Sequence, residues 1–188
     1  MKILVTGGAG FIGSHACERL LADLHEVVAL DNFDHSYPAA RKQRNIAALL
    51  PHHNFKLVNG DVGDRIEVSK LLQSEKFDAV LHLAAQSGAR ASIKNSLKYE
   101  QTNVTSLIGL LEAIKQHGPH KIVAASCSSV YGNSTPLPFR EDAPCLQQLS
   151  PDGAIHRAAE IFLGTYAPLY GLKIIVVRPF SAYGPRQR

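Results

Sequence analysis

A glycine-rich turn near the N-terminus constrains the fold of this chain more than any other segment. Residues 6–13 read TGGAGFIG, so Gly7, Gly10 and Gly13 recur at three-residue spacing. An apolar run precedes the turn, and an amphipathic stretch over residues 11–23 follows it. Small residues are needed where a strand turns sharply into a helix and where the backbone must approach a pyrophosphate. The segment therefore predicts a strand, a tight turn and a helix whose N-terminus binds phosphate.

An acidic residue ends the next apolar run. Asp31 directly follows the run at residues 27–30. In dinucleotide-binding units, an acid about 20 residues beyond the glycines accepts hydrogen bonds from the ribose hydroxyls. A carboxylate there repels a 2′-phosphate, which favours NAD over NADP. The alternative interpretation is a glycine-rich turn that serves the fold alone.

Short apolar runs alternate with longer amphipathic stretches along the whole chain. This alternation is typical of parallel strands joined by right-handed helical crossovers. It predicts an α/β fold with a doubly wound parallel sheet of the Rossmann type, about six strands, and helices on both faces. We expect a single NAD-binding domain over residues 1–188. The expected strands are 3–5, 27–30, 55–58, 79–84, 121–126 and 172–177, and the expected helices are 11–23, 39–50, 65–74, 95–117 and 151–169.

Composition narrows the classes of function. Of the 188 residues, 45% are hydrophobic and 19% are charged, which excludes global disorder. The net charge of +4 is small and forms no block, so nucleic-acid and membrane-surface binding lack electrostatic support. No apolar run is long enough for a transmembrane helix. These features leave a small molecule as the expected partner.

Three cysteines bear on the compartment and on metal binding. Cys17, Cys127 and Cys145 are too few, and oddly numbered, for a disulfide framework. They also lack the CxxC spacing of zinc sites, so their spacing predicts no metal site. We therefore expect a reducing, cytoplasmic setting.

Several further segments, taken together with the glycine turn, resemble one known family. The chain is similar to the N-terminal part of extended short-chain dehydrogenases/reductases of the NAD-dependent epimerase/dehydratase group, and among these to nucleotide-sugar 4-epimerases. The resemblance implies an NAD(H)-dependent enzyme, and it implies that this chain lacks most of the substrate-binding domain. The segments are TGGAGFIG at 6–13, DN at 31–32, GDVGD at 60–64, HLAAQSGAR at 82–90, TNV at 102–104, SSVYG at 128–132 and RPFSAYGPRQR at 178–188.

The resemblance also implies which residues surround an extended dinucleotide. Ala84 and Ala85 are explained equally well by packing at a strand end. The implied positions are Gly7, Gly10, Phe11, Ile12 and Gly13 around the pyrophosphate, Asp31 and Asn32 at the adenosine ribose, Asp61 and Val62 at the adenine, Leu83, Ala84, Ala85 and Gln86 along the path to the nicotinamide ribose, and Ser126 and Phe180 near the nicotinamide. Asn103 is implied as a support of the fourth helix and of the cofactor site.

The catalytic positions of the family carry other residues in this chain. Relatives read much like SPYGASKRAAE, whereas residues 150–160 read SPDGAIHRAAE. Asp152 therefore stands at the position of the catalytic tyrosine, and His156 at that of the lysine. The position of the serine or threonine that holds the substrate oxygen carries Cys127. Because remote binding energy from a substrate domain is also missing, these changes argue against nucleotide-sugar epimerisation.

The replacements suggest a catalytic set. Asp152 and His156 are four residues apart on an expected helix, so their side chains can pair. The carboxylate would raise the pKa of the imidazole, and His156 could then protonate a carbonyl under reduction. Cys127 would contribute a thiol or a thiolate in the same pocket. The plainer interpretation is an aspartate that stabilises the helix dipole, a packed histidine and a buried cysteine.

Three functions follow from these residues. The first is an NAD(H)-dependent oxidoreductase that transfers hydride to or from a small carbonyl or hydroxy compound. The second is a catalytically degenerate, epimerase-like module that binds NAD(H) and has a regulatory or interaction role. The third is a nucleophilic hydrolase built on Cys127, His156 and Asp152.

We also expect a homodimer, because relatives commonly pair two of these helices into a four-helix bundle. Apolar residues suited to such an interface lie on both helices, although the same stripes could belong to the core. They are Leu107, Leu110, Leu111 and Ile114 on residues 95–117, and Ile161, Phe162 and Tyr166 on residues 151–169.

Overall fold

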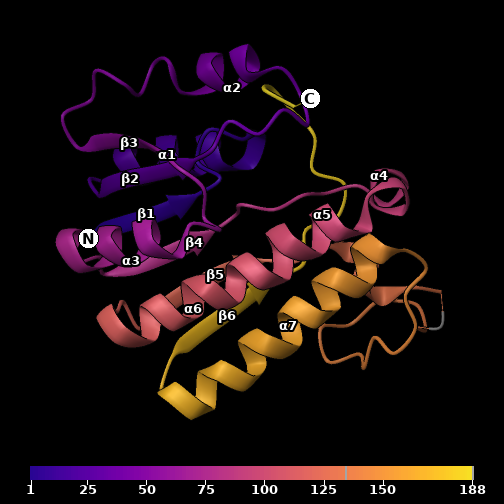
Figure 1. The fold of residues 1–188 in the computed structure, drawn as a ribbon. Coiled ribbons are helices and arrows are strands. Elements are labelled where there is room, and N and C mark those ends of the chain that lie inside the picture. The colour runs from indigo at the N-terminus through magenta and orange to yellow at the C-terminus, as the bar shows by residue number, and fades with distance from the viewer. Residues whose placement is uncertain (134, 188) are drawn as a thin grey trace.

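Six parallel strands form one sheet, which confirms the predicted doubly wound fold (Figure 1). The structure is a computed structural model that describes residues 1–133 and 135–187, so Arg188 at the end of the RPFSAYGPRQR segment lies outside it. The strands follow the order β3-β2-β1-β4-β5-β6. They are β1 (Lys2–Thr6), β2 (Glu26–Asp31), β3 (Phe55–Asn59), β4 (Ala79–His82), β5 (Lys121–Ala125) and β6 (Lys173–Val177).

The strand order reverses at β1, and this reversal places the candidate site. β2 and β3 extend the sheet to one side of β1, whereas β4, β5 and β6 extend it to the other. Val5 of β1 is in register with Ala29 of β2 and with Leu81 of β4. The connections that leave β1 and β4 cover opposite faces, so a crevice opens between them at the carboxyl ends of the strands.

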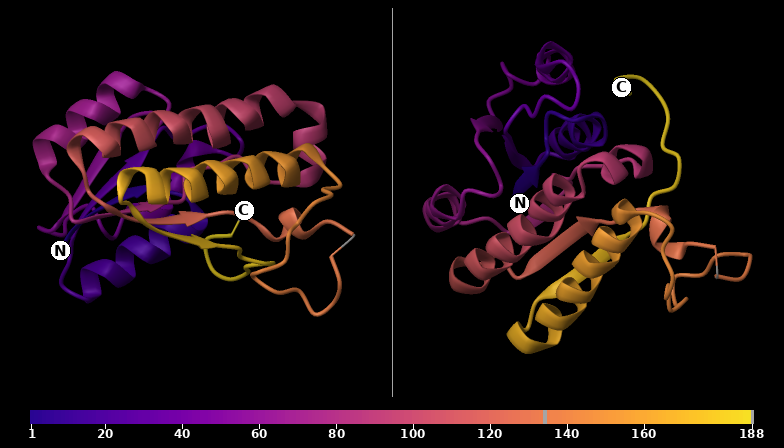
Figure 2. Two further views of the ribbon diagram at one scale, coloured as in Figure 1. Left: turned by 90° about the horizontal axis from the view of Figure 1, so that it is seen from below. Right: turned by 45° about the vertical axis from the view of Figure 1, so that its right-hand side comes forward.

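Helices cover both faces of the sheet. They are α1 (Phe11–Ala22), α2 (Ala39–Ile46), α3 (Arg65–Glu75), α4 (Ala89–Lys94), α5 (Ser96–Glu100), α6 (Ser106–His117) and α7 (Pro151–Tyr170), with a π-helical turn η1 (Gln101–Thr105) and a 3₁₀ turn η2 (Ser128–Tyr131). Figure 2 shows α3, α6 and α7 on one face and α1 on the other. Side chains of a strand alternate between faces, so Leu4 joins the core under α3 and α6, and Ile3 and Val5 join the core under α1. Among the described residues, no helix has the length and apolarity needed to cross a membrane.

The helix expected over residues 95–117 is present, but it contains a π-helical turn: α5, η1 and α6 follow one another without a gap over residues 96–117. The short helix α4 precedes it and was not expected. Asn95 begins α5, where its side chain accepts a hydrogen bond from the Lys98 N–H at 3.3 Å. In the wide π turn, Asn103 accepts from the Gln86 N–H and donates to the Gln86 carbonyl, both at 2.8 Å. The π turn therefore fixes the loop that follows β4.

Two elements end earlier than the sequence predicts. β4 stops at His82, and the Leu83 N–H makes the last backbone hydrogen bond to β1, to the Thr6 carbonyl at 3.1 Å. The Thr6 hydroxyl also lies 3.2 Å from the Leu83 and Ala84 N–H groups and accepts from both. This side-chain acceptor turns the chain away from the sheet and toward the crevice. α2 stops at Ile46 rather than near residue 50, and a series of turns follows it.

The apolar stripe on α6 belongs to the core. Leu107, Leu110, Leu111 and Ile114 are at most 2% exposed and pack beneath α6 against the sheet. These residues are therefore not available to a dimer interface. Of the two interpretations of their pattern, the structure supports packing in the core. On α7, by contrast, Ile161 and Phe162 are 55% and 36% exposed, and Tyr166 is partly buried. The homodimer stays a prediction that rests on α7.

Replacing Gly13 with alanine is expected to destabilise the fold by about 1–3 kcal/mol, because the new Cβ would lie 2.1 Å from the Gly7 carbonyl oxygen. Gly164→Ala is the matched control, since a Cβ on Gly164 in α7 meets nothing within 4 Å. That control is expected to gain up to about 1 kcal/mol from the higher helix propensity of alanine. Urea unfolding of both variants tests this expectation, and equal stabilities would contradict it.

Candidate functional site

A cleft of about 490 Å³ lies at the carboxyl ends of the strands, a size usual for small-molecule sites. Its walls are formed by the segments that follow the six strands, together with the start of α7. Every cofactor residue expected from the sequence lines this cleft except Asn103, which supports the wall from behind through Gln86. The lining residues among them are Gly7, Gly10, Phe11, Ile12, Gly13, Asp31, Asn32, Asp61, Val62, Leu83, Ala84, Ala85, Gln86, Ser126 and Phe180.

The glycine turn has the geometry that close approach of a phosphate requires. Gly7 has a φ of +72°, and a Cβ there would lie 2.8 Å from the Ala84 nitrogen. Gly10 is the N-cap of α1 and has an extended backbone with no side chain to cap the helix. The first N–H groups of α1 therefore face the cleft without a side-chain acceptor, which suits an anion.

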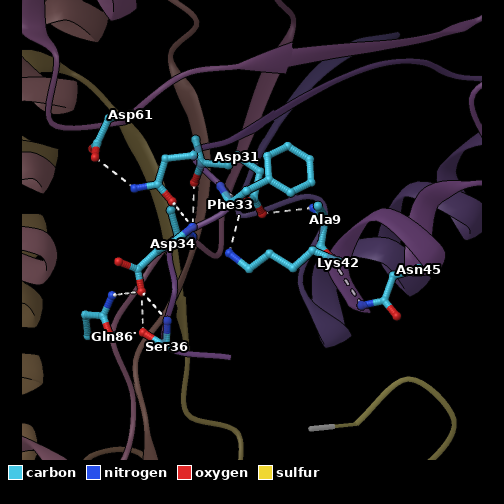
Figure 3. Close-up of polar contacts among 12 residues, drawn as sticks. Ala9, Asp31, Phe33, Asp34, Ser36, Lys42, Asn45, Asp61 and Gln86 are labelled. Carbon is cyan, nitrogen blue, oxygen red and sulfur yellow. Dashed lines mark hydrogen bonds and ion pairs between the residues drawn. The ribbon is translucent and has the colours of Figure 1, made fainter. Parts of the chain in front are cut away.

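Asp31 is tied into the base of the cleft from three sides (Figure 3). One carboxylate oxygen accepts from the Lys42 ammonium at 2.9 Å and from the Phe33 N–H at 2.8 Å. The other accepts from the Ala9 N–H of the glycine turn at 3.0 Å. The Asn45 side chain of α2 also donates to the Ala9 carbonyl, at 3.1 Å. α2 is thereby joined to the turn.

Lys42 alters the electrostatic argument for NAD. The sequence-based preference for NAD rests on repulsion between the Asp31 carboxylate and a 2′-phosphate. In the structure, the Lys42 ammonium balances this charge at 2.9 Å, and the side chain of Asp31 is only 2% exposed. The repulsion is therefore weaker than predicted. Lys42 lies in a polar stretch with no motif, so no sequence signal marked it.

A second acidic residue, Asp34, links the loop after β2 to the loop after β4 (Figure 3). Its carboxylate accepts from Gln86 Nε2 at 3.1 Å and from the Lys98 ammonium at 2.9 Å, and also from Ser36. Burial opposes ionisation of Asp34, but these hydrogen bonds prevail and hold its pKa well below the usual range. Asp61 is fixed similarly, because it accepts from the Asn32 side chain at 2.8 Å. The sequence analysis did not identify Asp34.

The structure brings the three replaced catalytic positions together. Cys127 Sγ lies 3.8 Å from one carboxylate oxygen of Asp152, and His156 Nε2 lies 3.8 Å from the other. All three side chains line the cleft, although Asp152 and His156 are only 2% and 4% exposed. Asp152 also accepts from the Gly88 N–H at 3.3 Å, and its own N–H donates to Ser92 at 3.0 Å.

The predicted imidazolium at His156 is wrong. Burial lowers the pKa of His156, and this cost outweighs the opposing influence of the Asp152 and Glu160 carboxylates. Burial also raises the pKa of the Cys127 thiol, and Asp152 adds to that shift. Both shifts favour the uncharged forms of the imidazole and the thiol. This arrangement disfavours the nucleophilic hydrolase, which needs a thiolate.

Two further polar groups lie beneath this cluster. His82 at the end of β4 is fully buried, with its Nδ1 at 2.8 Å from the Thr6 hydroxyl, and burial lowers its pKa to about 4. Glu160 of α7 accepts from Arg178 through both oxygens at 2.8 Å and from Arg157 at 3.0 Å. Burial opposes ionisation of Glu160, but these bonds lower its pKa.

The fold and the cleft define a doubly wound dinucleotide-binding protein. The sequence model of the NAD dependent epimerase/dehydratase family matches residues 3–188, and the chain belongs to this family.

Similar proteins are mostly sugar-nucleotide 4-epimerases. A UDP-glucuronate 4-epimerase of Thermodesulfobacterium geofontis is 40% identical over 185 residues, which cover 98% of this chain and 57% of that protein. A Bacillus cereus UDP-glucuronic acid 4-epimerase in complex with UDP-glucuronic acid and NAD superposes with a TM-score of 0.90 at 38% identity, over 100% of this chain and 59% of that one. A Thermus thermophilus UDP-glucose 4-epimerase in complex with NAD superposes with a TM-score of 0.87 at 34% identity, over 100% of this chain and 58% of that one. The chain thus spans less than two thirds of the length of these relatives.

Replacing Lys42 with methionine is expected to cost about 3 kcal/mol of stability, because the Asp31 charge would be left buried without a cation. The double variant Asp31→Asn/Lys42→Met is expected to recover part of this loss. Lys98→Met is the control, since the Lys98–Asp34 pair is more exposed and is worth less than about 1 kcal/mol. Urea unfolding measures all three, and equal losses for Lys42→Met and Lys98→Met would contradict the assignment.

Stability is expected to fall as the pH is lowered from 7 to 5, in part because of His82. Its folded-state pKa of about 4 lies below the unfolded value of about 6.5, so the unfolded chain takes up the proton first. This residue alone then removes roughly 2 kcal/mol between those pH values. His82→Asn should flatten the dependence, whereas His120→Asn, at an exposed position, should leave it unchanged. An unaltered slope in His82→Asn would contradict this account.

Proposed function

We propose that the chain binds NAD(H) in this cleft and transfers hydride to or from a small carbonyl or hydroxy compound. The observation that carries the proposal is the glycine turn, whose bare backbone leaves the N-terminus of α1 open to a pyrophosphate. Membership of the NAD-dependent epimerase/dehydratase family supports the same cofactor. Two similar structures contain NAD.

The residues of the cleft fit an extended dinucleotide. Gly10, Phe11 and Ile12 would hold the pyrophosphate through main-chain N–H groups. Asn32 and Asp61, already joined at 2.8 Å, would border the adenosine end. The loop after β4, from Leu83 to Gln86, would border the nicotinamide ribose. A bound NAD(H) supplies the hydride donor or acceptor, and the protein supplies orientation.

The changed catalytic positions support a small substrate rather than a nucleotide sugar. The similar proteins named above are UDP-sugar 4-epimerases. Asp152 and His156 also stand where the family carries the tyrosine and lysine that move a proton. General acid–base help is typically worth about 10²–10⁴-fold, so hydride transfer would be slower without it but would still proceed with a reactive carbonyl.

A second candidate function is a module that binds NAD(H) without turnover and serves regulation or interaction. The burial of Asp152 and His156, at 2% and 4% exposure, favours it, because their polar atoms present little surface to a substrate. The cofactor cleft would then be kept while catalysis is lost.

The proposal predicts that purified protein, freed of any bound nucleotide, binds NADH with micromolar or tighter affinity in a calorimetric titration. Gly10→Ala should weaken binding by at least about tenfold, because its Cβ would occupy the path of the pyrophosphate. The variant should still fold, since Gly10 has a φ of −68° and its Cβ would lie 3.1 Å from its nearest neighbour, the Gly7 oxygen. Gly164→Ala is the control that should bind normally.

Turnover separates the two candidates. Loss of NADH absorbance on addition of small aldehydes, dicarbonyls or hydroxyketones would support the oxidoreductase. NADH binding without turnover across such a panel, with UDP-sugars included, would favour the binding module. Absence of NADH binding would overturn both. Asp31→Ala is a poor probe of the cofactor, because it would leave the Lys42 ammonium buried without its partner.

A further inference from the structure

The three side chains at the replaced catalytic positions are all of types that bind metals. Cys127 follows β5, and Asp152 and His156 lie one helical turn apart at the start of α7. A sulfur, a carboxylate oxygen and a ring nitrogen from these residues lie within 4.8 Å of one another. Tetrahedral zinc, with bonds of about 2.0–2.3 Å, holds its ligand atoms about 3.3–3.6 Å apart. Small rotations of the side chains would close the cluster to that size.

The buried acids of the structure provide an independent observation. Among the residues that the structure describes, three acidic side chains are buried: Asp31, Asp152 and Glu160. Lys42 pairs with Asp31 at 2.9 Å, and Arg178 pairs with Glu160 at 2.8 Å. Each of these carboxylates thus has a cationic partner, as buried charges generally require.

Asp152 is the exception. In the ranges 1–133 and 135–187 it has no lysine or arginine within 4.0 Å, and its only ion-pair neighbour is the His156 ring at 3.8 Å. Its other contacts are the Gly88 N–H at 3.3 Å and the Cys127 thiol at 3.8 Å. At 2% exposure, Asp152 thus has none of the basic side chains that accompany the other two buried carboxylates. A cation from solution, held between the carboxylate, the sulfur and the imidazole, would balance it.

We propose that Cys127, Asp152 and His156 bind one divalent cation, preferably zinc, and leave one coordination position open to the cleft. Thiolate, imidazole and carboxylate are together a ligand set that suits zinc. Three protein ligands with an open fourth position are typical of a catalytic rather than a structural zinc site. The Gly88 N–H orients the Asp152 carboxylate, as outer partners of metal ligands usually do.

The cysteine spacing gave no sign of this site. The ligands come from a strand end and from an i, i+4 pair on a helix, which only the fold brings together. The useful signal was the pair Asp152 and His156 on one helix face, combined with a cysteine at the end of a neighbouring strand.

The site also has a chemical consequence, which rests on the proposed function. The cation would lie where relatives carry the tyrosine that moves a proton, in the same cleft as the cofactor residues. There it would polarise a carbonyl or hydroxyl oxygen as a Lewis acid. The replacements at Cys127, Asp152 and His156 would then have a single explanation.

Cobalt provides the test, because Co²⁺ replaces zinc and is visible. The full chain, freed of metal with a chelator and kept reduced, is titrated with Co²⁺ in the absence of NADH. We expect one equivalent to bind, with a thiolate-to-cobalt charge-transfer band in the near ultraviolet and the strong visible bands of four-coordinate cobalt. Zn²⁺ should displace it. Absence of the charge-transfer band in the wild-type chain would overturn the proposal.

Variants assign the ligands. Cys127→Ser should abolish the charge-transfer band, whereas Cys17→Ala, which removes another buried cysteine, should retain it. Asp152→Asn keeps the side-chain shape and an acceptor for the Gly88 N–H, and it should weaken cobalt binding by at least about tenfold. A band that persists in Cys127→Ser, or unchanged affinity in a folded Asp152→Asn, would contradict the assignment.

A measurement on the wild-type chain guards against variants that fail to fold. Zn²⁺ should slow alkylation of Cys127, followed by peptide mass spectrometry, and leave the buried Cys17 and Cys145 unaffected. Equal alkylation of Cys127 with and without Zn²⁺ would count against the site. NADH binding is measured separately, so loss of the cobalt signal tells against the metal site, and loss of NADH binding tells against the proposed function.

Discussion

Backbone packs directly against backbone where β1 turns into α1, and the rest of the cleft is arranged around this contact. A side-chain carbon on Gly13 would lie 2.1 Å from the Gly7 oxygen, and one on Gly7 would lie 2.8 Å from the Ala84 nitrogen. The distances between α1, the turn and the loop after β4 are therefore set by main-chain atoms, which have no rotamers to adjust. Asp31 reaches the Ala9 N–H because the turn is held at this position.

The charges around the cleft have two different functions. Asp31 and Glu160 are matched by basic side chains, and each joins two neighbouring parts of the fold: β2 to α2 in the first case, and α7 to the segment after β6 in the second. Their charges are used within the fold. Asp152 lies at the cleft beside a thiol and an imidazole and, among the described residues, has no lysine or arginine partner, so it is the buried acid to which the proposed cation would bind.

Much of the fold was predictable, because its signals are local. The strand–turn–helix at the glycine turn, the parallel order and the cleft follow from apolar periodicity and from the glycine spacing. The π turn within residues 95–117 was not, because the sequence there keeps an amphipathic pattern. At this turn Asn103 forms hydrogen bonds with Gln86 across the loop after β4. Tertiary contacts of this kind produce no periodic pattern of apolar residues from which they could be predicted.

The site was predictable in its positions but not in its electrostatics. The resemblance located Cys127, Asp152 and His156 at the catalytic positions, and they do lie together. The protonation state of His156 depends on how much water the fold removes, which no spacing reveals, and burial outweighed the neighbouring carboxylate. The partnership of Lys42 with Asp31 likewise depends on how α2 returns to the sheet.

The π turn η1 has a geometric consequence for the helix that contains it. An α-helix advances by roughly 100° per residue, and a π turn accommodates one extra residue, so the side chains before and after it belong to two different angular phases. Tyr99 before the turn is directed to the Ser87 carbonyl, whereas Leu107 after it is directed to the sheet. One continuous helix can thus contact the loop after β4 at one end and the apolar core at the other. A deletion of a single residue within η1 would bring the two ends into the same angular phase, so that both contacts could no longer form at once.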